Sequence, residues 1–454
     1  MSVEPENIIT YNRTRPEVDQ FRFCHAPFNN IYFGNRGYVM ACCFNKLHVI
    51  GRYPQHSITE IWNGAKAGEL RKAITDGDFS KGCTGCQALF DHQNFGGIPS
   101  KVYDHHTHTN SFPKRMEFEL DNTCNLECIM CTGELSSSIR ERRERKPPIL
   151  SPYDDAFIQQ LEQYIPFLET AQFLGGEPFL IPVYFGIWEK ISALNPSVKI
   201  SIQTNGTILN SRVKRLLDEL QVSISISIDS LQQNTYKKIR VNGDLERVLE
   251  NVDYFSDYVK RKQTSLSFSF CPLTENWTEI PDFVAFCNVH KASVFFNTVI
   301  YPAEFSLMNL SNEQLNEIIA FLQVAILPQS NTIEQQNYSR YQSLINEIKS
   351  YAQKSSVSSE QSEGKLSLEE YLDKMREHIR NTSTASELTQ QGQLRTVSAN
   401  IHSILAFAEK DGLKDQAQIQ ITTINPDVLF QNLIRMDDLE RAYTLFKERI
   451  LKVL

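Results

Sequence analysis

The chain has 454 residues, of which 41% are hydrophobic and 22% charged, and this composition is typical of a globular protein with more than one domain. The formal net charge of −8 argues against a nucleic-acid partner, because Lys and Arg must neutralise phosphates in such complexes. No basic and apolar leader is visible at the N-terminus, and Glu177, glycines and prolines interrupt the most apolar window. We therefore expect a cytoplasmic protein without a membrane segment.

Ten cysteines occur in the chain, and eight of them fall into two groups. In a reducing compartment such groups point to metal or iron-sulfur ligation rather than to disulfides. The first group is Cys24, Cys42, Cys43, Cys83 and Cys86, and the second is Cys124, Cys128 and Cys131. Cys271 and Cys287 stand apart.

Residues 20–95 contain short predicted strands, a turn at "GNRG" and an amphipathic helical segment at 57–74. Cys24, Cys42, Cys83 and Cys86 supply four ligands if Cys43 is left out. Neighbouring side chains of an extended segment point to opposite faces, so only one of the adjacent pair readily faces a metal, and Cys42 is the better candidate. A zinc site remains the alternative to an iron-sulfur cluster.

This pattern resembles the twitch module, the shortened form of the SPASM domain. The resemblance implies one auxiliary four-iron four-sulfur cluster that moves electrons. The module usually follows a barrel domain, whereas here it precedes the segment that resembles one. Residues 96–113 read as a polar linker.

Residues 114–305 alternate between predicted strands and helices, which implies an α/β fold with parallel strands in a sheet or barrel. In such folds the chemistry lies at the carboxyl ends of the strands. The predicted strands are "MEFEL", "TAQFLGG", "VKISIQTNG", "VSISISIDS", "SLSFSF" and "ASVFFNTVI".

The first of these strands leads into "CNLECIMC", and the second ends in "GGEP", residues 175–178. Three cysteines can hold three irons of a four-iron cluster and leave the fourth iron open to a substrate or cofactor. The glycines permit close backbone approach to a ligand, with a carboxylate beside them. A zinc site completed by a distant ligand is the alternative.

Together, "CNLECIMC" and "GGEP" resemble the radical S-adenosylmethionine (SAM) superfamily over about residues 116–300. The resemblance implies a partial (β/α)6 TIM-type barrel and a SAM-binding 4Fe-4S cluster on Cys124, Cys128 and Cys131. It also implies reductive cleavage of SAM to a 5′-deoxyadenosyl radical, which abstracts hydrogen from the substrate. Reduced flavodoxin or ferredoxin would be the electron donor.

The resemblance also places contacts to SAM by strand order. Gly175, Gly176 and Glu177 would frame the amino group, and Arg240 would pair with the carboxylate. The ribose hydroxyls would meet residues that follow the third and fourth strands, and the backbone of Met130 would meet the adenine. The ribose candidates are Thr204, Asn205, Ser227 and Asp229, for which strand-end capping is the alternative, as a surface charge is for Arg240.

Substrate identity is the least constrained property. Cys271 and Asn297 follow the fifth and sixth strands and are substrate-contact candidates. Residues 306–454 are predicted to be mainly helical. The expected function is that of an oxidoreductase or maturase that crosslinks, oxidises or epimerises a peptide or protein. The alternatives are dehydrogenation or rearrangement of a sugar, alcohol or nucleotide, and a non-catalytic iron-sulfur electron carrier.

Overall fold

The computed structural model describes residues 5–15, 22–91, 93, 95–104, 112–299, 302–358, 367–382 and 387–423, together with residues 429, 433 and 443. The chain divides into two compact units. The first comprises Met1–Phe270, Asp282–Phe296 and Leu327–Arg340. The second comprises Cys271–Pro281, Asn297–Ile326 and Tyr341–Leu454.

The first unit is built on one sheet, which within the described residues has nine strands in the order β3-β2-β1-β4-β5-β6-β7-β8-β9. All six strands predicted from the sequence are confirmed, and each is parallel to its neighbour. They are β4 Arg115–Phe118, β5 Thr170–Phe173, β6 Lys199–Thr204, β7 Val222–Ser227, β8 Leu266–Phe270 and β9 Ser293–Phe296. This parallel α/β arrangement is that of a partial TIM-type barrel.

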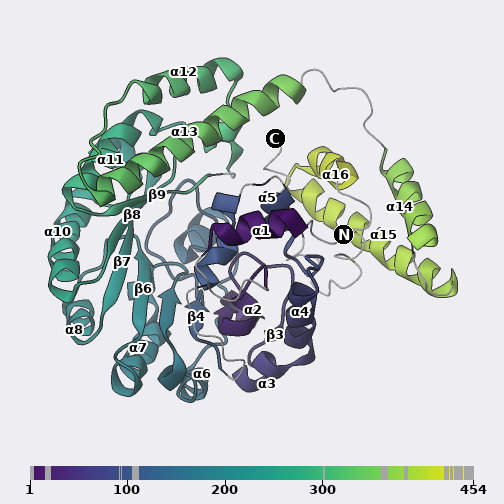
Figure 1. Cartoon of the computed structure of the whole chain (residues 1–454), viewed down its shortest axis with the longest axis horizontal. Helices are drawn as coiled ribbons and strands as arrows, with labels where there is room; N and C mark the ends of the chain where they lie inside the picture. The colour runs from purple at the N-terminus through teal and green to yellow at the C-terminus, as the bar shows by residue number, and fades with distance from the viewer. Residues whose placement is uncertain are drawn as a thin grey trace. The chain divides into compact units, whose positions relative to one another are not determined.

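The crossover helices lie along the outer side of these strands in Figure 1. The sequence places them there because each is amphipathic: in α8, for example, Val213, Leu216 and Leu217 are buried. Side-chain caps at Asp154, Asn210 and Asp244 begin three of the helices. The helices are α6 Asp155–Leu161, α7 Pro182–Leu194, α8 Ser211–Glu219, α9 Gln233–Ile239, α10 Leu245–Lys262 and α11 Ile280–Val289.

The cysteine-rich N-terminal segment adds three strands to the same sheet: β1 Asn30–Phe33, β2 Tyr38–Met40 and β3 Gly51–Arg52. Strand β1 pairs with β4 in parallel, and β2 and β3 follow as antiparallel neighbours. Phe33 stacks on Phe118, which in turn stacks on Phe173, at centroid distances of 5.6 and 4.9 Å. The two cysteine-bearing segments therefore share one sheet and one aromatic core.

Helices around these strands are short. The predicted amphipathic segment forms two helices, because the backbone at Gly64 is extended between them. The helices of this region are α1 Pro5–Arg13, α2 Ala26–Asn29, α3 Ile58–Asn63, α4 Ala65–Thr75 and α5 Thr84–Asp91. In the predicted linker, residues 105–111 lie outside the described residues.

Single-turn elements connect the others. The 3-10 helices are η1 Asn35–Gly37, η2 Phe95–Gly97, η3 Pro99–Tyr103, η5 Ile165–Phe167, η6 Pro178–Leu180, η7 Trp277–Glu279, η8 Ala303–Phe305 and η9 Leu307–Asn309. A π-helical turn, η4 Ile139–Arg143, follows the loop that carries the second cysteine group.

The C-terminal region is helical, as predicted. Its helices are α12 Asn312–Gln323, α13 Thr332–Ser358, α14 Leu368–Thr382, α15 Glu387–Lys410 and α16 Lys414–Thr423. A hydrophobic core lies among the last three helices and includes Met375, Val397, Ile401 and Ala417. No helix in the described ranges combines the length and apolarity needed to cross a bilayer.

Candidate functional site

The second cysteine group lies in a loop without regular secondary structure, immediately after β4. Its backbone bonds to the last residue of α9 and to the segment that follows it: Glu127 N donates to Val241 O and Ile129 N to Ile239 O, at 3.0 and 2.9 Å. These two bonds bring Arg240 beside the loop. Its Nη1 lies 3.9 Å from Cys128 Sγ, within reach of a weak hydrogen bond to sulfur.

All three cysteines of this loop are half-buried. Burial raises the pKa of Cys124, raises that of Cys128 to about 11 and raises that of Cys131 to about 12. Binding of a cluster to these thiols as thiolates would therefore release protons. N–H donors face the sulfurs, since Asn205 Nδ2 lies 3.9 Å from Cys124 Sγ and Arg240 approaches Cys128. Such donors suit thiolates that ligate a cluster.

The two glycines that follow β5 lie against the backbone of the cysteine loop. Gly176 N donates to Asp121 O at 3.1 Å, and Glu177 N donates to Thr123 O at 2.7 Å. A Cβ on Gly176 would lie 2.1 Å from Thr123 O, and Gly175 has a φ of +95°. The close approach that these glycines permit in the structure is thus to the loop itself.

Glu177 is fully buried. Its carboxylate accepts hydrogen bonds from Thr204 Oγ1 and Asn205 N, each at 2.7 Å, and from Phe179 N at 3.2 Å. Burial raises its pKa to about 7, and the hydrogen bonds, led by that from Asn205 N, act in the opposite direction. Glu177 therefore ties the end of β5 to the end of β6, where Thr204 and Asn205 had been predicted as ribose contacts.

Asp229 and Arg240 form a buried ion pair, with Arg240 Nη2 2.7 Å from Asp229 Oδ2. Their side chains are 0% and 7% exposed, so Arg240 is not a surface charge. The two residues predicted to contact different parts of SAM thus contact each other. Ser227 ends β7 and is half-buried, as is Met130 in the cysteine loop.

The first cysteine group is also brought together. Burial is the main cause of the raised pKa of Cys24, followed by the nearby Cys83, and Cys86 contributes as well. For Cys42, burial is followed by Cys24, Cys43 and Cys83. The pKa values of Cys83 and Cys86 are raised to about 12 and 11, with burial again the main cause.

Cys43 has a different environment from Cys42. Its Sγ lies 3.8 Å from Tyr103 Oη, which donates to the buried Glu117 at 2.7 Å. Burial and then Glu117 raise the Cys43 pKa. Cys42 Sγ instead accepts from Asn45 N at 3.3 Å, while Asn45 Nδ2 donates to Cys83 Sγ at 3.4 Å.

Within the described residues, no group of three or more His, Cys, Asp or Glu side chains is arranged to hold a single metal ion. A four-iron cluster does not require such convergence, because each thiolate binds a different iron atom.

Cys271 and Asn297 belong to the second unit. Cys271 is half-buried, and its carbonyl accepts from Asn276 Nδ2 at 3.0 Å. Asn297 is exposed. Their role as substrate contacts stays a prediction.

The sequence did not predict the residues on the C-terminal side of the cysteine loop that donate hydrogen bonds to it. Arg143 Nη1 donates to the carbonyls of Glu127 and Cys128 at 3.2 and 3.4 Å, and Arg142 Nη1 to Glu127 Oε1 at 3.2 Å. The available signal was the basic run "RERRERK" directly after the loop. The run reads as an exposed helix face, and Arg142 and Arg143 are indeed exposed, while their guanidinium groups also reach the loop.

Both cysteine-bearing regions match known domain families. Residues 119–287 match the radical SAM superfamily, and residues 24–87 match the SPASM iron-sulfur cluster-binding domain. The chain therefore contains a radical SAM domain at residues 119–287, and a SPASM domain precedes it at residues 24–87. These domains imply a SAM-binding 4Fe-4S cluster and an auxiliary cluster, as predicted.

Curated relatives match over part of their length. The probable GTP 3′,8-cyclase of Methanocaldococcus jannaschii is 28% identical over 175 residues, which is 38% of this chain and 55% of the relative. The GTP 3′,8-cyclase of Lactiplantibacillus plantarum is 24% identical over 197 residues, 43% of this chain and 56% of the relative. The chain thus spans about half the length of these relatives. Among solved structures, Streptococcus suis SuiB bound to precursor peptide SuiA is 14% identical, with a TM-score of 0.35, over 57% of this chain and 58% of that one.

Proposed function

We propose that this enzyme reductively cleaves SAM and abstracts hydrogen from a peptide or protein substrate. The observation that carries the proposal is the meeting of three elements at the carboxyl edge of the parallel sheet. The cysteine loop after β4, the GGEP segment after β5 and the Asp229–Arg240 pair are joined by hydrogen bonds and close contacts. A chain that only carried electrons would not need this assembly beside an incomplete ligand set.

Cys124, Cys128 and Cys131 would hold the first cluster, which leaves one iron for SAM. When bound, the cluster and SAM would supply an electron and the 5′-deoxyadenosyl radical. Arg240, oriented by Asp229, would pair with the SAM carboxylate. Glu177 would act mainly by holding Thr204 and Asn205 in place, since three protein donors already occupy its carboxylate.

Cys24, Cys42, Cys83 and Cys86 would hold the auxiliary cluster. The neighbours of the two adjacent cysteines support Cys42 as the ligand, because Cys43 faces Tyr103 and the buried Glu117. A cluster with four protein ligands has no open iron for a substrate, so it would pass electrons to or from the substrate radical. Reduced flavodoxin or ferredoxin would supply the reducing electron.

A nucleotide substrate is the second candidate. It is favoured by the curated relatives, which are named GTP 3′,8-cyclases and match 38% and 43% of the chain. The SPASM match favours the peptide, because enzymes with that domain often modify peptides.

Anaerobic reconstitution with iron and sulfide tests the proposal. With dithionite and SAM, we expect 5′-deoxyadenosine and about eight irons per chain, four for each cluster. Cys128→Ala should abolish 5′-deoxyadenosine formation and halve the iron content, because it removes one of only three ligands.

The matched control is Cys43→Ala, which should keep both clusters and the cleavage of SAM. If the wild-type protein formed no 5′-deoxyadenosine although both clusters were reduced, the hypothesis of a radical enzyme would be rejected. The hypothesis of an iron-sulfur electron carrier would then remain. Loss of SAM cleavage in Cys43→Ala but not in Cys128→Ala would overturn the ligand assignment.

A further inference from the structure

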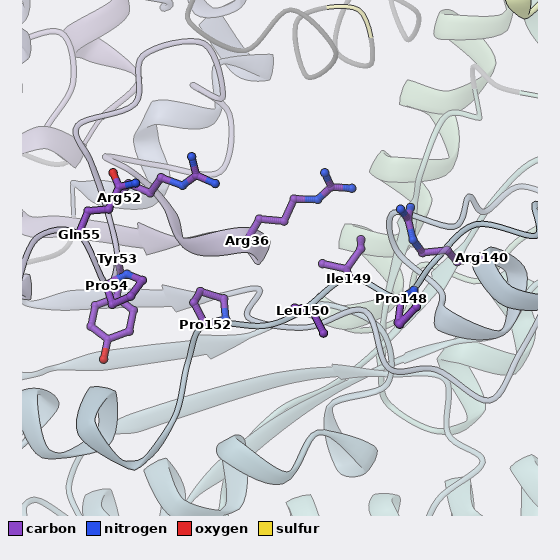
Figure 2. Close-up of a pocket in the computed structure, with 10 residues that line it drawn as sticks. All are labelled: Arg36, Arg52, Tyr53, Pro54, Gln55, Arg140, Pro148, Ile149, Leu150 and Pro152. Atoms are coloured by element: carbon purple, nitrogen blue, oxygen red, sulfur yellow. The ribbon is translucent and has the colours of Figure 1, made fainter.

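A pocket of about 430 Å³ lies within the first unit, between residues 36–55 of the N-terminal segment and the segment that follows the cysteine loop. The N-terminal side is lined by Arg36, Arg52 and residues 53–55, and the other side by Arg140, residues 148–150 and Pro152. Figure 2 shows the guanidinium of Arg36 extending toward the side of Arg140, with Ile149 and Leu150 drawn below these two arginines.

The sheet places this pocket at the edge where the cysteine loop begins. Strand β1 is parallel to β4, so the turn after β1, which carries Arg36, lies at the same edge as the end of β4. Arg52 is paired with Tyr38 just after that turn. Glu134, three residues after Cys131, accepts from Arg36 Nη2 at 2.9 Å and from Arg140 Nη1 at 2.8 Å. The pocket is therefore beside the candidate cofactor site and separate from it.

The charges of the pocket are unbalanced. Glu134 is shared by Arg36 and Arg140, which leaves two positive charges in excess once Arg52 is counted. Among the ion pairs of the described residues, none includes Arg52, whose guanidinium carbon lies 4.7 Å from the centroid of the Tyr38 ring. The buried Nε of Arg36 has no hydrogen-bond acceptor among those residues. In a chain of net charge −8, this is a local site for an anion.

The apolar residues that line the pocket indicate which class of anion fits it. Leu150 is 84% exposed beside the arginines, with Ile149 and prolines around it. No lining aromatic offers a face for a base, because Tyr53 is 3% exposed and stacks on Tyr153 with a centroid distance of 5.5 Å. A carboxylate beside an aliphatic side chain fits these features better than a nucleotide does.

We infer that this pocket anchors an acidic segment of the peptide substrate, with a Glu or Asp carboxylate on Arg52 and Arg36 and a neighbouring aliphatic side chain against Leu150. The inference rests on the proposed peptide substrate. It adds the chemistry of the segment that is recognised and a place of contact beside the site of radical formation.

Calorimetric titration of the reconstituted full-length protein tests the inference. The probe is an acetylated and amidated ten-residue peptide with two Leu-Glu pairs in a Gly/Ser background, and its counterpart has Gln for Glu. We expect the glutamate peptide to bind about tenfold more tightly, because charge-assisted hydrogen bonds to Arg are lost in the counterpart. Arg52→Gln should remove about tenfold of that affinity, and more salt should weaken it.

The matched control is Arg247→Gln, which changes an exposed arginine on α10 and should bind both peptides as the wild type does. Equal titration by the two peptides, or equal behaviour of Arg52→Gln and Arg247→Gln, would overturn the inference. Displacement of the glutamate peptide by GTP, lost in Arg52→Gln, would assign the pocket to phosphate and also overturn it.

The 5′-deoxyadenosine assay on the wild type separates this inference from the proposed function. SAM cleavage without preference for the glutamate peptide rejects only the pocket assignment. Preferential binding without SAM cleavage rejects the radical chemistry and keeps the acidic-segment site.

Discussion

At the scale of single residues, Arg240 joins the two parts of the candidate cofactor site. Its guanidinium contacts Asp229 at 2.7 Å through Nη2 and approaches Cys128 Sγ at 3.9 Å through Nη1. A planar fork can make both contacts at once and still present an edge to a carboxylate. A lysine ammonium at the same place keeps the charge but cannot hold all of these partners in fixed directions.

Arg240→Lys should therefore weaken SAM binding by about tenfold or more, while the chain stays folded, because the loss is one of bidentate geometry rather than of charge. Anaerobic equilibrium dialysis of the reconstituted protein with radiolabelled SAM measures this. Arg247→Lys, a change on the exposed side of α10, should bind SAM as the wild type does. Unchanged affinity in Arg240→Lys would remove Arg240 from the proposed SAM site.

The residue types of the candidate site were predictable from motifs, but their partners were not. Glu177 was recognised beside its glycines, yet its hydrogen bonds to Thr204 and Asn205 depend on how the ends of β5 and β6 face each other. Likewise, Asp229 and Arg240 are eleven positions apart, and spacing alone does not show that they form a pair. Side-chain partners across loops are set by tertiary packing, which a single sequence does not encode locally.

At the scale of elements, the GGEP segment and the cysteine loop form one packed unit. Gly176 lies so close to Thr123 O that a methyl group in place of its hydrogen would force the two backbones apart. The hydrogen bonds from Gly176 N and Glu177 N to the loop would be strained by the same movement.

Gly176→Ala should accordingly destabilise the protein by about 2 kcal/mol or more and lower the iron content toward four per chain, because the loop that holds Cys124 shifts. Thermal unfolding and iron analysis measure the two effects. Gly68→Ala is the control, since its new Cβ would meet nothing within 4 Å on α4, and alanine favours a helix over glycine by about 1 kcal/mol. Gly176→Ala with full iron content would show that the loop tolerates the displacement.

The six strands of the central domain were predicted because each is a short segment bounded by turn residues, with helical stretches between most of them. The addition of β1 to that sheet was not predicted from the sequence. "NIYF" is too short to indicate a partner, and its pairing with β4 is accompanied by the stacking of Phe33 on Phe118, which is visible only in the fold. Gly64 also divides the expected helix at 57–74, where the sequence pattern alone reads as continuous.

At the scale of the whole molecule, the N-terminal SPASM region and the radical SAM region are parts of one sheet. The SPASM match precedes the radical SAM match in the chain, and the two regions are joined by strand pairing rather than only by a linker. Removal of the N-terminal region would expose the hydrogen-bonding edge of β4 and the apolar face that Ile31 and Phe33 cover, both of which are fully buried.

Deletion of residues 1–95 removes the auxiliary ligands and should therefore yield a chain that aggregates and holds little iron, even though Cys124, Cys128 and Cys131 remain. Size-exclusion chromatography and iron analysis after anaerobic reconstitution measure this outcome. Truncation after residue 366 is the matched control of similar size. The buried core that it removes is formed by residues between Tyr371 and Tyr443 alone, so the remaining chain should stay soluble with about eight irons. A soluble 96–454 chain that binds about four irons and cleaves SAM would show that the central domain folds without β1, and that the shared sheet serves only to place the auxiliary cluster.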